Sequence, residues 1–125
     1  MPTLDEITFQ HPSEKEFARL LNFYGIRWEY EPRVFPLTRA ADGRVLSAFA
    51  PDFYLPDQDL YIELTTQSTR LNNLKNRKVR RLQELYPTIN IKLLNRRDLR
   101  GLAIKYAFPD PAASNTAEGH PRDHA

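Results

Sequence analysis

The segment Leu60–Thr66 limits the folds open to this chain, because it is predicted to be a buried β-strand with a charged side chain inside it. Its residues, LYIELTT, are apolar or β-branched apart from Glu63. Side chains alternate along a strand, so Tyr61, Glu63 and Thr65 share one face, together with Gln67 if the pairing continues. Burial of an unpaired carboxylate is costly. The fold must therefore supply a partner for Glu63.

The residues before this strand bring a second carboxylate to it. Val45–Leu55 is predicted to be a strand and Pro56–Asp59 a tight turn, so the two strands form a hairpin that places Asp52 near Glu63. Mg²⁺ and Mn²⁺ prefer oxygen ligands, and Mg²⁺ is often held by one or two carboxylates with a substrate phosphate. The pattern suits a metal site. It equally allows Asp52 to cap a bulge and Glu63 to pair with a helix lysine.

The remaining segments predict an α/β fold in the order α-β-β-β-α-β-α. We expect a mixed sheet flanked by helices, in which the first strands form a meander and a helical crossover reaches the last. The first helix is predicted to begin near Ser13, with Glu16 completing a capping box, and to end at Gly25. The other predicted elements are strands at 26–30 and 34–37, a turn at 42–43, helices at 71–86 and 96–106, and a strand at 89–94.

Length and composition narrow the class of protein. A chain of 125 residues fits one domain, expected over residues 9–108, while residues 109–125 contain no Val, Ile, Leu, Met or aromatic residue and are predicted to be a disordered tail. The absence of Cys excludes disulfides, Cys-based metal sites and thiol nucleophiles. No apolar run approaches the ~20 residues of a membrane span, and the N-terminus lacks a signal-peptide pattern. We expect a cytoplasmic protein without a membrane partner.

The formal net charge of +2 conceals an uneven distribution. Residues 1–69 carry 6 basic and 11 acidic side chains, a net −5, whereas residues 70–105 carry 11 basic and 2 acidic ones, a net +9. Clustered Lys and Arg release counterions when they meet phosphates, so the basic segment indicates a polyanion partner. A solvated helix face is the alternative. The predicted phosphate contacts on the helix are Arg70, Arg77, Arg80 and Arg81.

Two lysines of this helix fall on its apolar side. At about 100° per residue, Lys75 and Lys78 lie on the same stripe as Leu71, Leu74, Leu82 and Leu85. A lysine on an apolar stripe needs a partner or must extend to solvent. Glu63 is the predicted partner, either in a purely structural ion pair or in a catalytic site.

The residues PDFYLPDQDLYIEL, in which Pro51-Asp52 is followed by Glu63-Leu64-Thr65, resemble the signature of the PD-(D/E)xK nuclease superfamily. SEKEFARLLNFYGIRWEYEP is similar to that superfamily's opening helix and first strand, so the resemblance covers roughly residues 13–94. It implies a restriction-endonuclease-like αβββαβ core. It also implies hydrolysis of phosphodiester bonds in nucleic acid, DNA in the first place, with Mg²⁺ or Mn²⁺ held by Asp52 and Glu63.

The chain departs from this motif at Thr65, which stands where the superfamily has Lys. The resemblance then implies either a displaced lysine, Lys75 in the first place and Lys78 in the second, or a catalytically inactive nucleic-acid-binding module. Gln67 would position water or phosphate, and Glu14 would correspond to the carboxylate of the superfamily's opening helix. Since many enzymes of this fold dimerise, a homodimer is a further expectation.

The segment from Tyr61 to Leu94 also resembles a bacterial branch of the superfamily in which some members carry a hypoxanthine phosphoribosyltransferase label. Phosphoribosyltransferases bind the sugar phosphate with adjacent acidic residues followed by Gly and Thr, and this chain has no such run. The resemblance therefore implies, at most, an association with a nucleotide-salvage enzyme of that kind.

Overall fold

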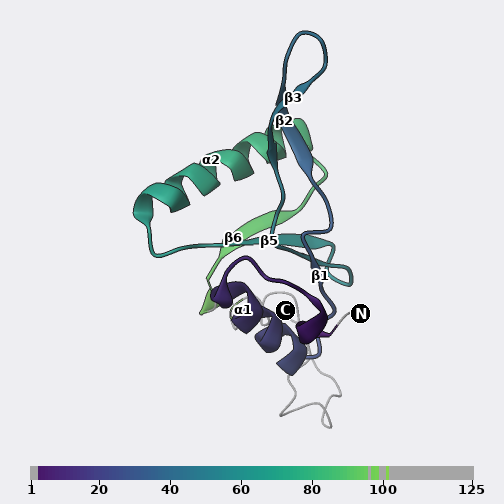
Figure 1. The fold of residues 1–125 in the computed structure, drawn as a ribbon, viewed down its shortest axis with the longest axis vertical. Helices are drawn as coiled ribbons and strands as arrows, with labels where there is room; N and C mark the ends of the chain where they lie inside the picture. Colours follow the sequence, from purple (N-terminus) through teal and green to yellow (C-terminus); the bar gives the residue numbers. More distant parts are fainter. Residues whose placement is uncertain (1–2, 96, 99–100, 102–125) are drawn as a thin grey trace, which may run out of the picture. The chain divides into compact units, whose positions relative to one another are not determined.

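The structure is a computed structural model, and it describes residues 3–95, 97–98 and 101. These residues form two compact units, one up to Arg27 together with 97–98 and 101, and the other spanning Trp28–Asn95. The predicted α/β class is confirmed (Figure 1). Most of the predicted helix at 96–106 and the whole predicted tail at 109–125 lie outside the described residues, and the predicted domain bounds, 9–108, stay a prediction.

The described residues of the first unit include a short 3-10 helix, η1 (Leu4–Glu6), and the helix α1 (Pro12–Phe23). The predicted N-cap at Ser13 is wrong, because α1 already begins at Pro12, whose fixed φ suits the first helical position. Glu16 lies 3.6 Å from Arg19 in an ion pair and forms no capping box with Ser13. The predicted end is confirmed, since Gly25 follows the helix with a φ of 69°.

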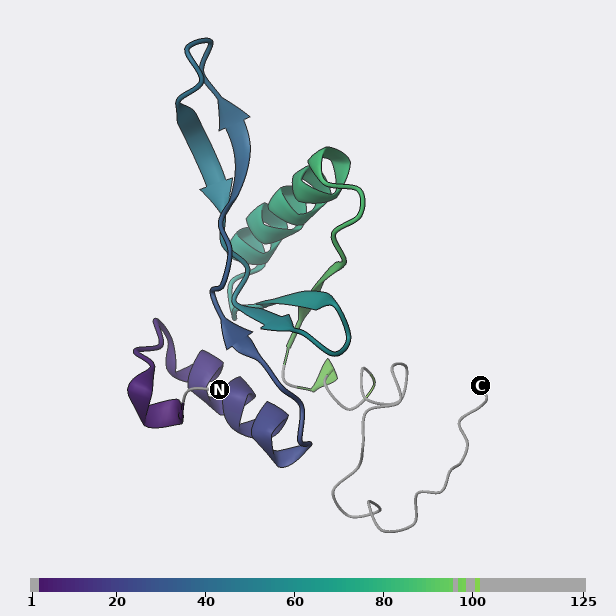
Figure 2. The same cartoon turned by 90° about the vertical axis from the view of Figure 1, so that its right-hand side faces the viewer.

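The second unit holds a mixed sheet, a separate hairpin and one helix (Figures 1 and 2). The sheet has the order β1-β4-β5-β6, antiparallel except for the parallel pair β5–β6, and β2 pairs only with β3. The helix α2 is the predicted crossover between β5 and β6. The elements are β1 (Glu29–Tyr30), β2 (Phe35–Arg39), β3 (Val45–Phe49), β4 (Phe53–Leu55), β5 (Leu60–Leu64), α2 (Thr69–Leu85) and β6 (Ile91–Leu94).

Two predictions about the strands are wrong. The single strand expected over Val45–Leu55 is divided into β3 and β4, which belong to different sheets. Pro51 lies in the break, and because it has no N–H group it cannot donate to a strand ladder. The expected meander is also absent from the second unit: β1 pairs with β4, and the β2–β3 hairpin is inserted between them in the sequence.

The hydrophobic core of the second unit lies where α2 packs against the hairpin and β6. Val79 and Leu82 are the buried residues of α2. They join a cluster that comprises Phe35, Leu37, Phe49, Tyr61 and Ile91. Only part of the apolar stripe predicted for this helix is buried, since Leu71 and Leu85 are each 40% exposed. None of the helices in the described part of the chain is long and apolar enough to cross a bilayer.

The predicted turn between β4 and β5 is present at Pro56–Asp59 and is held by side-chain hydrogen bonds. Asp59 has a φ of 51°. The Tyr54 hydroxyl donates to Asp59 Oδ1 at 2.8 Å, and Asn90 Nδ2 donates to the Asp59 carbonyl oxygen at 3.1 Å. The turn is thus tied to β4 and to the residue that precedes β6, which holds β5 in register between its two neighbours.

The hydrogen bond to Asp59 raises the pKa of the Tyr54 phenol from 10.0 to about 12. The folded chain therefore holds this proton more tightly than the unfolded chain, so the stabilisation is complete below pH 10 and is lost as the pH rises from 10 to about 12. We expect Asp59→Asn to move the Tyr54 pKa towards 10.0, measured by NMR titration of the Tyr54 Cζ resonance. Asp57→Asn makes the same charge change two residues away and should leave this pKa unchanged. A wild-type Tyr54 that titrates with an ordinary pKa would contradict the account.

Candidate metal and nucleic-acid site

The pairing of β4 with β5 brings Asp52 and Glu63 together. Phe53 is paired with Ile62, so Asp52 and Glu63 are adjacent across the two strands. The Asp52 N–H donates to Glu63 Oε1 at 3.1 Å, and the Leu64 N–H donates to Asp52 Oδ2 at 2.9 Å. The two residues are only 7% and 6% exposed. The neighbouring carboxylates expected from the sequence are thus present, and each accepts a backbone N–H of the other strand.

Lys75 reaches this pair from α2. Its Nζ atom lies 3.0 Å from Glu63 Oε2 and donates to the Leu64 carbonyl oxygen at 2.6 Å. The Lys75 side chain is 24% exposed and the Glu63 side chain 8%, so the contact lies largely away from solvent. The partner predicted for Glu63 is therefore observed. A structural ion pair and a displaced catalytic lysine both require this contact.

The second candidate, Lys78, lies elsewhere. Its side chain is exposed on α2, and it makes no ion pair or hydrogen bond with the described residues. A residue three positions along a helix is rotated by about 60° relative to the first. This rotation turns Lys78 away from the buried face that carries Lys75.

The loop between β5 and α2 is closed by Asn72, which sequence reasoning missed. Asn72 Oδ1 accepts from the Thr66 N–H at 2.8 Å, and Asn72 Nδ2 donates to the Thr66 carbonyl oxygen at 3.0 Å. Ser68 is the N-cap of α2, and its hydroxyl accepts from the Leu71 N–H at 3.2 Å. A serine three residues before Leu71 was a readable N-cap signal. Because Lys75 follows Asn72 by about one helical turn, this loop also sets where Lys75 emerges.

Three further residues were predicted to belong to the site or its motif: Thr65, Gln67 and Glu14. Thr65 is half-buried and its N–H donates to the Leu94 carbonyl oxygen at 2.8 Å, beyond the end of β5. Gln67 is exposed in the loop, so the continued strand pairing that would have carried it is not observed. Glu14 is buried in the first unit, where its Oε1 accepts from the Gln10 N–H at 3.1 Å. The roles expected for Gln67 and Glu14 stay predictions.

The four predicted phosphate contacts are all exposed on α2: Arg70, Arg77, Arg80 and Arg81. At about 100° per residue, Arg70, Arg77 and Arg81 lie within about 40° of one another around the helix. Arg80 is rotated by about 100° from Arg81. The only acidic residue of α2 is Glu84, which lies 3.4 Å from Arg81. The helix therefore presents a strongly cationic outer face along its length.

The chemistry of the buried pair suits a hard divalent cation. In the described part of the chain no group of three or more His, Cys, Asp or Glu residues could hold a metal ion, so Asp52 and Glu63 would have to hold one as a pair. An ionised carboxylate has roughly four acceptor positions, and a hydrogen bond to one oxygen occupies one of them. Two carboxylates with a substrate phosphate are a common way of holding Mg²⁺. The residues present fit such a site.

Comparisons of the chain with known protein families, with curated proteins and with solved structures found no match.

Removal of Lys75 should destabilise the fold. Lys75→Met leaves the buried Glu63 oxygen and the Leu64 carbonyl without this donor, and an unsatisfied buried acceptor costs about 1–3 kcal/mol. We expect urea denaturation to show a loss of that size for Lys75→Met. Lys78→Met makes the same chemical change on the exposed side of the helix and should cost less than about 0.5 kcal/mol. Equal stabilities of the two variants would contradict the importance of the Lys75–Glu63 contact.

Proposed function

We propose that this chain is a Mg²⁺- or Mn²⁺-dependent endonuclease domain that hydrolyses phosphodiester bonds in nucleic acid, DNA in the first place. The observation that carries the proposal is the buried Asp52–Glu63 pair with Lys75 Nζ 3.0 Å from Glu63. A restriction-endonuclease-like αβββαβ core is part of the same proposal. It is supported by the antiparallel β4–β5 pair and by the helical crossover from β5 to the parallel strand β6.

Asp52 and Glu63 would hold the metal ion. A bound Mg²⁺ or Mn²⁺ supplies positive charge beside the scissile phosphate and makes water a better nucleophile at neutral pH. The chain contributes preorganisation: the backbone N–H groups of Asp52 and Leu64 hold the two carboxylates in place before any substrate binds. Their burial strengthens the attraction for a cation, because the local dielectric is lower than that of water.

Lys75 would take the role that Thr65 cannot fill. A threonine hydroxyl carries no charge, whereas the Lys75 ammonium has three N–H donors. Two of them are directed to Glu63 Oε2 and to the Leu64 carbonyl oxygen. The third can donate to a phosphate oxygen or to the attacking water, so the same side chain can orient Glu63 and stabilise charge on the substrate.

The exposed arginines of α2 would bind the flanking phosphates. Contacts of this kind fix the position of a nucleic acid and carry no sequence information. They predict binding that weakens steeply as the salt concentration rises. Arg70, Arg77 and Arg81 share one side of the helix and are the strongest candidates for a continuous track.

An inactive nucleic-acid-binding module is the second candidate. The observation that favours it is that both oxygens of Glu63 already accept hydrogen bonds, from the Asp52 N–H and from Lys75. On this alternative, the Lys75–Glu63 contact is purely structural. It predicts salt-dependent binding without cleavage.

A plasmid-nicking assay with Mn²⁺ separates the two candidates. We expect the wild-type chain to nick DNA and the isosteric variants Asp52→Asn and Glu63→Gln to lose about 100-fold or more in rate, because they remove the proposed ligand charge. Asp57→Asn makes the same charge change at an exposed position of the turn and should retain wild-type activity. Circular dichroism checks that each variant is folded. Nicking that is independent of metal or of Asp52 would contradict the endonuclease proposal, and salt-dependent binding alone would favour the inactive module.

A further inference from the structure

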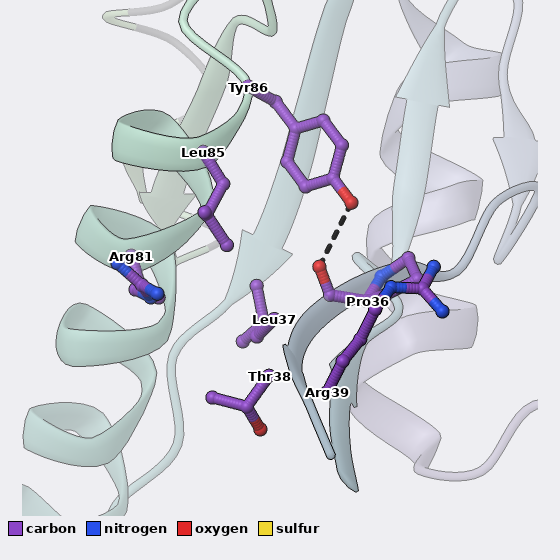
Figure 3. A pocket seen from close by; sticks show the side chains of 7 residues that line it. All are labelled: Pro36, Leu37, Thr38, Arg39, Arg81, Leu85 and Tyr86. Carbon is purple, nitrogen blue, oxygen red and sulfur yellow. Dashed lines mark hydrogen bonds between the residues drawn. The ribbon is translucent and has the colours of Figure 1, made fainter. Parts of the chain in front are cut away.

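A second feature of α2 lies beyond the carboxylate pair. A pocket of about 440 Å³ lies between β2 and the C-terminal half of the helix (Figure 3). This volume is within the roughly 300–1,000 Å³ typical of small-ligand pockets. The lining residues are Pro36, Leu37, Thr38, Arg39, Arg81, Leu85 and Tyr86.

The pocket has an apolar wall that is held in place by the core. Leu37 is buried and Leu85 is 40% exposed at the mouth. The Tyr86 hydroxyl donates to the Pro36 carbonyl oxygen at 2.9 Å, drawn as the dashed line in Figure 3. The Tyr86 ring also packs edge-on against Phe35 with a centroid distance of 5.2 Å. Because both ends of Tyr86 are fixed, the wall exists before a ligand binds.

Two guanidinium groups flank this apolar wall, Arg39 from β2 and Arg81 from α2 (Figure 3). Arg39 Nη1 donates to the Gly43 carbonyl oxygen at 3.0 Å, and Arg81 Nη1 lies 3.4 Å from Glu84 Oε1. A guanidinium has five N–H donors, so each retains donors for an anion. An apolar wall between two cationic groups is complementary to a nucleotide, which has a flat, largely apolar base and a phosphate on either side in a strand.

The pocket also lies at the end of the cationic stripe of α2. This stripe comprises Arg70, Arg77 and Arg81, which recur on one side of the helix. At 1.5 Å per residue, Arg81 lies about 9 Å and Leu85 about 15 Å along the helix from Lys75. These distances correspond to a few nucleotides of one strand, whose phosphates are about 3.4 Å apart along a duplex and further apart when the strand is extended.

We infer that this pocket is a nucleotide subsite for a single strand of nucleic acid. It takes the base and sugar of an unpaired nucleotide a few positions from the phosphate held at Asp52 and Glu63, while Arg39 and Arg81 bind the adjoining phosphates. A paired and stacked base cannot enter such a pocket without being extruded. The inference rests on the proposed function, because that function defines where the scissile phosphate lies relative to the pocket. The substrate class is then a single strand, or a duplex with an unpaired flank.

The test compares two variants of the full chain that add the same charge to α2. Leu85→Glu places a carboxylate at the mouth of the pocket, and Gln83→Glu places one on the exposed helix outside it. Binding is measured without divalent metal by fluorescence anisotropy, with a labelled oligothymidylate of about twelve nucleotides and a labelled duplex of the same length. We expect Leu85→Glu to weaken single-strand binding about 10-fold or more and duplex binding no more than about 3-fold. Gln83→Glu should weaken both by no more than about 3-fold.

Each result bears on the pocket separately from the nuclease proposal. Equal losses in the two variants, or equal losses on single strand and duplex, would overturn the subsite. Thymidine monophosphate that binds as tightly as the oligonucleotide would overturn it in favour of a small-molecule site. If the pocket-dependent preference for single strands is found without metal-dependent cleavage, the subsite stands and the endonuclease proposal fails. If cleavage depends on Asp52 but Leu85→Glu behaves as Gln83→Glu does, the endonuclease proposal stands and the subsite fails.

Discussion

The second unit is organised around one charge that is buried in the middle of a sheet. All five residues of β5 are buried, and Glu63 is among them. A carboxylate in that position is tolerated only if hydrogen bonds and an opposite charge replace its lost hydration. Asp52, directly before β4, supplies a backbone N–H, and Lys75 on α2 supplies the ammonium. Glu63 therefore has one partner from the start of the neighbouring strand and one from the crossover helix. The candidate site lies where these two elements contact Glu63.

The sequence predicted that Asp52 and Lys75 lie beside Glu63, because both contacts follow from local patterns. The turn residues at Pro56–Asp59 define the β4–β5 hairpin, strand alternation faces Glu63 inward, and helical spacing places Lys75 on the buried side of α2. The partners of β1 and β3 could not be read in the same way. Pairing between strands that are distant in the sequence depends on the whole sheet. Pro51 is a local signal for a break in the strand, but nothing local indicates that the chain then passes into another sheet.

The helix α2 shows a second limit of sequence patterns. Of its predicted apolar stripe Leu82 is buried, whereas Leu71 and Leu85 are each 40% exposed, and the other buried residue of α2 is Val79, which the predicted stripe did not include. Leu85 lies at the mouth of a pocket that β2 completes from some fifty positions earlier in the chain, a relation set by tertiary contacts alone. Asn72 was missed for a different reason: its side chain substitutes for backbone partners in a loop, and such bonds depend on the path of the loop.

The most direct test of the central claim, that Asp52 and Glu63 form a divalent-metal site, is the paramagnetic broadening of amide resonances by substoichiometric Mn²⁺. The account predicts that the amide signals of Asp52 and Leu64 broaden first, since these groups donate to the two carboxylates. Glu63→Gln should abolish this effect. Broadening that is unchanged in Glu63→Gln, or that centres on the exposed turn at Asp59, would contradict the account.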